Sequence, residues 1–148
     1  TTYDPDPTFQ FGQFSFSAWY DYEQIMGHRA PAPLKFKFET NLGGADIHGK
    51  RLLASFNFYA LYYLERMTFG RFRPYIEGGA GIVYSDFQLE EQGLRWNFNP
   101  QAGVGVQWYG PAETNWYAAL HAYHISNGGL HSDNRGINGL LLQLGYLF

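Results

Sequence analysis

The stretch from residue 94 to residue 109 alternates between two kinds of side chain, and this alternation constrains the fold more than any other feature. Its even positions are apolar or aromatic, and its odd positions are polar or glycine until Tyr109. A period of two residues predicts a β-strand with one apolar face and one polar face. Trp96 and Trp108 share the apolar face, twelve residues apart. At about 3.3 Å per residue and a tilt of about 40°, they are separated by roughly 30 Å, close to the spacing of the aromatic girdles of a membrane barrel.

Four further stretches carry the same two-faced pattern, at residues 34–42, 52–64, 72–84 and 139–148. Their polar faces place Lys, Arg and Glu between Gly and Gln, which suits a narrow lumen filled by charge pairs. Their apolar faces suit contact with lipid, where a closed barrel is the only sheet that leaves no backbone group unpaired. We therefore predict one all-β domain over residues 1–148, an eight-stranded antiparallel transmembrane β-barrel.

The beginning of the chain fits this pattern less well. Seven spans are evident, including residues 9–22, whereas single-chain bacterial barrels have an even number of strands. We expect the missing strand to be the first, poorly defined, and formed by residues 1–8 or by residues upstream of them. Within residues 9–22 the apolar phase changes after Phe11, and we interpret this change as a β-bulge.

Composition narrows the partners and leaves one alternative fold. The net charge of -3 argues against a nucleic-acid partner, and the lack of cysteine excludes disulfides and thiolate metal sites. No run of 18 apolar residues predicts a transmembrane helix. Thr1-Thr2-Tyr3 does not begin a signal peptide, so we expect a mature, trimmed or cytosolic chain. The alternative is a soluble barrel of lipocalin type with its apolar face inside, although soluble barrels rarely need strands of this length.

A candidate active site precedes the last strand. His124 and Ser126 are two residues apart, so on a strand their side chains point from the same face. A base and a hydroxyl in this arrangement can share the hydrogen bond that a serine nucleophile needs. Gly128 and Gly129 follow, and their backbone N–H groups could form an oxyanion hole. The pattern indicates an ester hydrolase.

The same segment carries a family resemblance. The run from His124 through Ser126, Asn127 and the two glycines, followed by Asn134-Arg-Gly136 and a final strand, resembles the PagL-type lipid A 3-O-deacylases. Those proteins are small eight-stranded outer-membrane enzymes. Residues 73–81 also resemble the family, and Phe148 behind alternating Leu and Tyr resembles the terminal signature of bacterial outer-membrane barrels. The likeness covers the second half of the chain well and the first third hardly at all.

The resemblance implies a role for each residue of the segment. Ser126 would attack the ester at the 3-position of lipid A, and His124 would act as the general base. The backbone near Gly128 and Gly129, with the Asn134 side chain, would stabilise the oxyanion, and Asn127 would support the site. The implied partner is lipid A or lipopolysaccharide of the outer leaflet. The implied location is the bacterial outer membrane, and no cofactor or metal is expected.

The third member of the site departs from the family. The family places a Glu two residues after the Gly of the Asn-x-Gly element, and this chain has Asn138 there. An amide can accept a hydrogen bond from the imidazole and fix its tautomer, but it supplies no charge. Asp133 in the preceding loop is a second candidate for the acid. A catalytically weakened or inactive barrel with a structural or adhesive role therefore stays open, as does homodimerisation.

The remaining polar residues receive structural interpretations. His121 has the opposite parity to His124 and is expected in the lumen, whereas His131 is expected in a solvated loop. His28, His48 and the three histidines near the site do not form a metal-ligand pattern. Glu77 is expected to form an ion pair in the lumen with Arg73 or Arg95.

Overall fold

The computed structural model of the chain describes residues 1–4, 8–47, 49–110 and 114–147, and consists almost entirely of β-strands. His48 and Phe148, which figure in the sequence analysis, lie outside the described residues. The elements in chain order are β1 (Thr2–Asp4), β2 (Phe11–Asp21), α1 (Tyr22–Met26), β3 (Leu34–Asp46), β4 (Lys50–Tyr63), η1 (Glu65–Met67), β5 (Phe72–Ser85), β6 (Trp96–Phe98), β7 (Gln101–Tyr109), β8 (Asn115–Ile125) and β9 (Ile137–Leu147).

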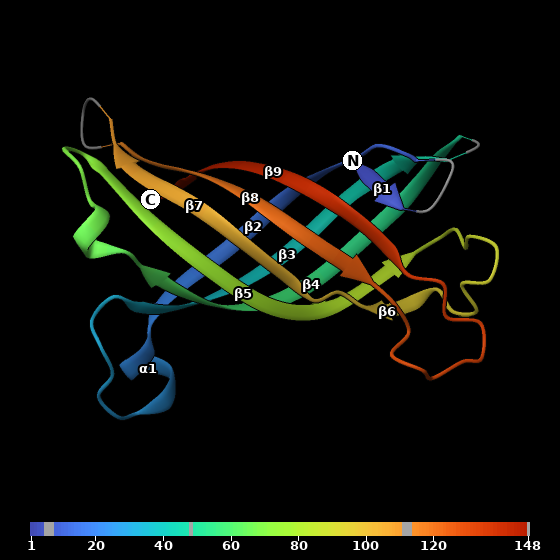
Figure 1. Cartoon of the computed structure of the whole chain (residues 1–148), viewed down its shortest axis with the longest axis horizontal. Coiled ribbons are helices and arrows are strands. Elements are labelled where there is room, and N and C mark those ends of the chain that lie inside the picture. Colours follow the sequence, from blue (N-terminus) through green and yellow to red (C-terminus); the bar gives the residue numbers. More distant parts are fainter. Residues whose placement is uncertain (5–7, 48, 111–113, 148) are drawn as a thin grey trace.

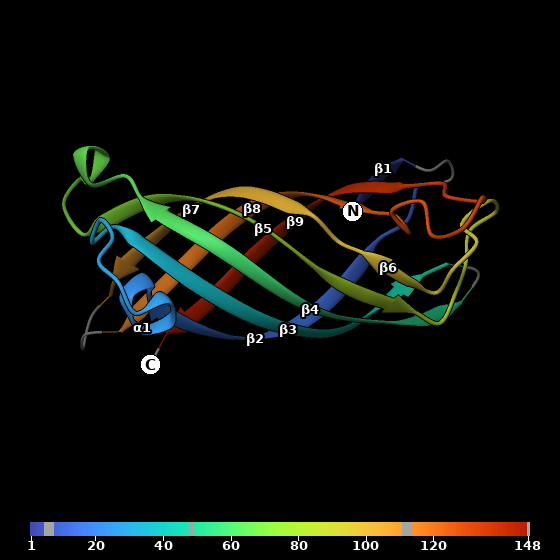
Figure 2. The ribbon, with the colours of Figure 1, turned by 90° about the horizontal axis from the view of Figure 1, so that it is seen from below.

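The strands form one antiparallel sheet in the order β1-β9-β8-β7-β5-β4-β3-β2, with β6 pairing β5 beside this path. The predicted all-β, antiparallel architecture with eight strands along the sheet is thus confirmed. β1 has three residues and pairs only with the start of β9, as expected for a poorly defined first strand. The long tilted strands curl so that β9 returns towards β2 (Figures 1 and 2). No helix among the described residues has the length and apolar character needed to cross a bilayer.

The two faces of the sheet follow the parity of the sequence. Large apolar side chains at even positions are exposed on the outer face, including Phe14 (83%), Phe16 (80%) and Leu142 (77%). Odd positions of the same strands point inward and are buried or half-buried, although many of them are polar. The prediction of an apolar exterior and a polar interior is confirmed.

A network of charged side chains fills the middle of the interior. Lys37 Nζ of β3 lies 2.6 Å from Glu77 Oε2 of β5. His121 of β8 completes the network, with Nε2 2.8 Å from Glu77 Oε1 and Nδ1 3.1 Å from Gln101 Oε1. The prediction that His121 lies in the lumen is confirmed. The expected partner of Glu77, Arg73 or Arg95, is wrong: its cation is Lys37. Arg73 lies near one end of β5 and pairs with Glu65 instead.

An apolar cluster closes the interior at the end of the sheet that carries β1 and β6, on the right of Figures 1 and 2. Phe9 and Phe11 pack into this cluster rather than on the outer face. The buried members are Ala45, Leu53, Val83, Phe87, Tyr123, Ile125 and Ile137. The register between β2 and β3 runs without a shift from Phe11 to Asp21. The predicted β-bulge is therefore wrong: the change of apolar phase marks where the interior itself becomes apolar.

The long strand expected over residues 94–109 is interrupted once. β6 and β7 pair with β5 in one continuous register, in which Phe98 faces Ile82 and Gln101 faces Gly79. Pro100 lies between β6 and β7 and has no N–H to donate to the ladder. Its carbonyl accepts a hydrogen bond from the His124 N–H at 3.0 Å.

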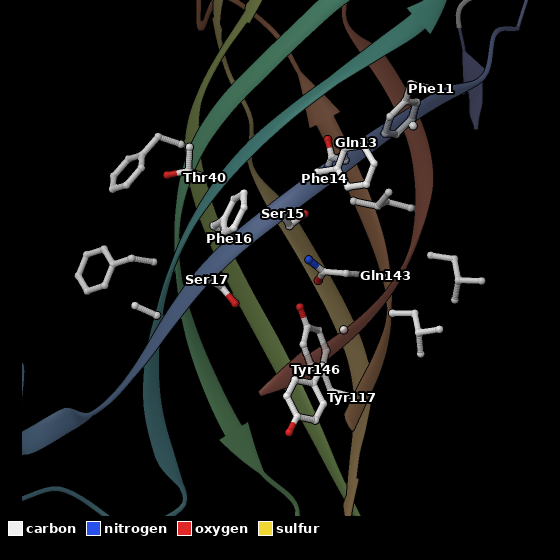
Figure 3. Close-up of a pocket in the computed structure, with 18 residues that line it drawn as sticks. Phe11, Gln13, Phe14, Ser15, Phe16, Ser17, Thr40, Tyr117, Gln143 and Tyr146 are labelled. Carbon is white, nitrogen blue, oxygen red and sulfur yellow. The ribbon is translucent and has the colours of Figure 1, made fainter. Parts of the chain in front are cut away.

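A groove of about 690 Å³ separates β2 from β9. Among the described residues no ladder joins these two strands, so each presents one edge to the groove. Figure 3 shows Gln143 of β9 on one side of it and Ser15 and Ser17 of β2 on the other. β1 bridges the gap at the end that holds the apolar cluster. It pairs with β9 on one side, and on the other side the Thr2 N–H donates to the carbonyl of Phe9, just before β2, at 3.0 Å.

Candidate active site

The candidate residues meet where β8 ends and β9 begins, beside β1 and β6 (Figure 1). His124 is paired directly with Asn138 in the β8–β9 ladder. Both side chains are half-buried on the outer face of the sheet, and Ser126 follows on the same face. Parity predicted one face for His124 and Ser126, and Asn138 lies on that face as well.

The imidazole of His124 is held by a neighbouring side chain and by the shape of the backbone. Its Nδ1 lies 2.7 Å from Asn138 Oδ1. Gly136 faces the other part of the ring, because a Cβ added there would lie 2.5 Å from His124 Cε1. Only a residue without a side chain leaves room for the ring at this point, which gives the glycine of the Asn-x-Gly element a physical role.

Asn138 also contacts a carboxylate that the sequence reasoning missed. Its Nδ2 donates to Asp4 Oδ2 at 2.9 Å, across the pairing of β1 with β9. Asp133, the acid considered from the sequence, accepts instead from Ser132 in the loop. Asp4 stands 134 residues before Asn138 in the chain. Nothing in the local sequence signals this contact, which depends on the pairing of the first strand with the last.

Ser126 is held by its backbone next to β6. Its carbonyl accepts from the Phe98 N–H at 2.8 Å, and its N–H donates to the Phe98 carbonyl at 3.1 Å. These two bonds fix the position from which the side chain leaves the sheet. In the described part of the chain, neither Ser126 Oγ nor His124 Nε2 has a hydrogen-bond partner, so both are available to a substrate. The hydrogen bond between a catalytic serine and its histidine is often long in an enzyme without substrate and tightens in the complex.

Asn127 organises the loop that follows. It is buried (1% exposed), and its N–H donates to Asn134 Oδ1 at 2.7 Å. Its side chain donates to the Asp133 carbonyl at 2.8 Å and accepts from the Gly129 N–H at 2.9 Å. A buried polar side chain with all its groups paired makes a rigid loop. Asn127 therefore holds the loop that follows Ser126 in place.

The two glycines of the loop differ in their hydrogen bonding. Both have positive φ, 64° for Gly128 and 85° for Gly129, which explains why glycine stands at these positions. The Gly129 N–H already donates to Asn127, so in this geometry it does not serve as an oxyanion donor. The Gly128 N–H has no acceptor among the residues that the structure describes. Asn134 uses Oδ1 within the loop, which leaves its Nδ2 available.

The loop between β5 and β6 supports the loop between β8 and β9. The Arg135 N–H donates to the Glu91 carbonyl at 2.8 Å, and Gly93 packs against His131. His131 is exposed, as predicted, and accepts from the Asp133 N–H at 3.0 Å. Over the described ranges, no three His, Cys, Asp or Glu residues gather in a way that could hold a metal ion.

The outer surface around these residues is apolar. Phe98 (45% exposed) is bridged to Ser126, and Trp96 (61%) stands two residues before it on the same face. Leu140 and Leu142 continue the outer face of β9 beyond Asn138. The polar site thus borders an apolar surface, which suits a substrate with a polar head and hydrocarbon chains.

Comparisons with known proteins agree with this description. The family model "Lipid A 3-O-deacylase (PagL)" matches residues 11–147. Among solved structures, the crystal structure of the outer membrane enzyme PagL has a TM-score of 0.68 at 18% sequence identity, and the alignment covers 92% of this chain and 93% of that chain. This likeness shows the same fold. No curated protein matches the chain in sequence. Because the family model spans nearly the whole sheet, the chain belongs to the PagL family of lipid A 3-O-deacylases.

Proposed function

We propose that the protein is an outer-membrane ester hydrolase that removes the 3-position acyl chain of lipid A, with Ser126 as nucleophile and His124 as general base. The observation that carries this proposal is the placement of both side chains on one outer face, with His124 bonded to Asn138 at 2.7 Å. Membership of the lipid A 3-O-deacylase family supplies the substrate.

The proposed reaction uses the free ring nitrogen of His124. Nε2 takes the proton of Ser126 Oγ as the oxygen attacks the ester carbonyl, which forms a tetrahedral intermediate with a negative oxygen. The intermediate collapses, the bond to the sugar 3-oxygen breaks, and His124 returns the proton to that oxygen. A water molecule, deprotonated by His124, then attacks the acyl carbon of the acyl-serine. The bond to Ser126 Oγ breaks, His124 returns the proton to Oγ, and the fatty acid is released.

The oxyanion is assigned to two donors in this proposal. The Gly128 N–H and the Asn134 Nδ2 have no other acceptor in the described structure, and both belong to the loop that Asn127 holds in place. Gly129 is assigned a structural part, since its N–H donates to Asn127. Donors that are fixed before the reaction stabilise developing charge at no cost of reorganisation.

The position of the site on the outer face suits a substrate that stays in the membrane. The ester of an acyl chain lies at the boundary between headgroups and hydrocarbon, and the site lies where the apolar outer surface ends. The exposed Phe98 and Leu140 beside it would contact the acyl chains. Lipid A would therefore reach Ser126 by lateral diffusion, without entering the barrel.

The deciding experiment is the mass of lipid A after incubation with the protein folded in detergent. We expect wild type to release a single 3-hydroxyacyl chain, and Ser126→Ala to lose at least about a thousandfold in rate. Ser132→Ala is the matched control, because Ser132 is an exposed serine of the same loop. An unchanged lipid A mass with wild type would favour the second candidate, a structural barrel, which the neutral Asn138 suggests.

A further inference from the structure

Asp4 reaches the candidate site from the opposite end of the chain. It lies on β1, opposite Asn138 in the ladder with β9, and its Oδ2 accepts from Asn138 Nδ2 at 2.9 Å. Asn138 in turn presents Oδ1 to His124 Nδ1 at 2.7 Å. The three side chains form one line of hydrogen bonds, Asp4 to Asn138 to His124, in which the carboxylate is the terminal group.

This line of hydrogen bonds allows one arrangement of protons. An ionised carboxylate only accepts hydrogen bonds, so the amide must turn its NH₂ towards Asp4. The amide oxygen then faces His124, and because that oxygen is an acceptor, His124 Nδ1 must carry the proton. Nε2 is left with a lone pair, which is the form that a general base requires.

We propose that Asp4 is a positioning residue that fixes the tautomer of His124 through Asn138. Without Asp4, the amide of Asn138 is free to turn over and present its NH₂ to the ring, which favours the tautomer with the proton on Nε2. The second effect of Asp4 is electrostatic. A carboxylate that accepts from the amide polarises it and strengthens its oxygen as an acceptor, which favours the imidazolium that forms during the reaction. This effect on rate rests on the proposed function, whereas the effect on the tautomer does not.

The tautomer can be measured without any activity. We would record nitrogen-15 NMR spectra of the His124 ring in the detergent-folded protein, for wild type and for Asp4→Ala. Asp46→Ala is the matched control, because Asp46 is an exposed aspartate at the same end of the sheet. We expect wild type and the control to carry the proton on Nδ1, and Asp4→Ala to show both tautomers. Spectra that are identical in all three proteins would overturn the proposal.

An exchange of the two side chains tests the electrostatic effect. Asp4→Asn with Asn138→Asp keeps the shape and both hydrogen bonds but moves the negative charge next to His124. Asn138→Asp alone places two carboxylates at the 2.9 Å separation of the present pair, where like charges cannot both ionise. We expect Asp4→Ala to lower kcat about tenfold to a hundredfold with KM nearly unchanged. The double exchange should restore at least the wild-type kcat.

The two kinds of failure are distinguishable. If the wild type releases the acyl chain and Asp4→Ala has the same kcat and the same His124 tautomer, the role of Asp4 is overturned and the proposed function stands. A tautomer that depends on Asp4 in a protein that releases no acyl chain would support the positioning role and overturn the proposed function.

Discussion

His124 Nδ1 and Asn138 Oδ1 lie 2.7 Å apart, on neighbouring strands and in direct register. The second residue is an amide at the position where the family resemblance leads one to expect a carboxylate. An amide oxygen orients an imidazole as well as a carboxylate does, but it adds no negative charge beside the ring. Variants at position 138 can therefore separate the effect of orienting the imidazole from the effect of a charge beside it on the reaction rate.

Asn138→Glu combined with Asp4→Asn should raise the rate of deacylation by at least about tenfold, because it places a charge beside the imidazole without a second carboxylate next to it. Asn138→Leu should lower the rate below wild type, since no acceptor remains for Nδ1. The measurement is the initial rate of fatty-acid release from lipid A in mixed micelles. A slower enzyme with both Asn138→Glu and Asp4→Asn that is folded normally would show that the amide is adapted to this site.

Gly136→Ala should displace the His124 ring, because the new methyl group would lie 2.5 Å from Cε1. We expect a loss of about a hundredfold in rate, as for other misplacements of about 1 Å in an active site. Gly12→Ala is the control, since a Cβ at Gly12 meets no atom within 4 Å. Equal rates for the two variants would mean that the ring has room to move without consequence.

Asn134→Asp should separate the two functions assigned to Asn134. The carboxylate still accepts from the Asn127 N–H, which keeps the loop folded, but the Nδ2 donor is lost. We expect the rate to fall about a hundredfold to a thousandfold, the usual cost of one oxyanion donor. Asn134→Ala should in addition loosen the loop, measured as faster hydrogen exchange at Asn127. Wild-type activity in Asn134→Asp would exclude Nδ2 as an oxyanion donor.

Lys37→Met should destabilise the sheet by about 3 kcal/mol, because it leaves the buried carboxylate of Glu77 without its cation. Lys37 also pairs with the buried Glu39 at 3.5 Å. The triple variant Lys37→Met, Glu39→Gln and Glu77→Gln should therefore recover most of this loss, since none of these three buried positions then carries an unpaired charge. Unfolding by urea in detergent, followed by tryptophan fluorescence, measures both. Equal midpoints for Lys37→Met and wild type would mean that water or His121 compensates the charge.

The sequence alone predicted the two faces of the sheet, because side chains on a strand alternate with a period of two residues. The same rule placed His124 and Ser126 on one face, and the pairing of β8 with β9 in the structure adds Asn138 to them. Short-range chemistry also indicated the turn at Gly128 and Gly129. These features depend on residues near one another in the chain.

The features that were missed depend on contacts between distant strands. Asp4 is brought to Asn138 by the pairing of β1 with β9, which no local pattern reports. Glu77 pairs with Lys37 and His121 because the sheet curls, and strand patterns do not give the curvature. The change of phase after Phe11 predicts a bulge only if the interior is polar along its whole length. One end of the interior is apolar, and Phe9 and Phe11 pack there.

The buried network of Lys37, Glu77 and His121 bears on how the chain enters a bilayer. Glu77 of β5 is paired with Lys37 of β3 and His121 of β8, so both of these partners lie outside the hairpins that β5 forms with its neighbours β4 and β7. A single hairpin that crossed the hydrocarbon would carry an uncompensated polar group with it, which is costly. The strands must therefore curl together before or during insertion, so that the charges meet away from lipid. The buried network thus implies an order of biogenesis, in which the sheet curls no later than it enters the membrane.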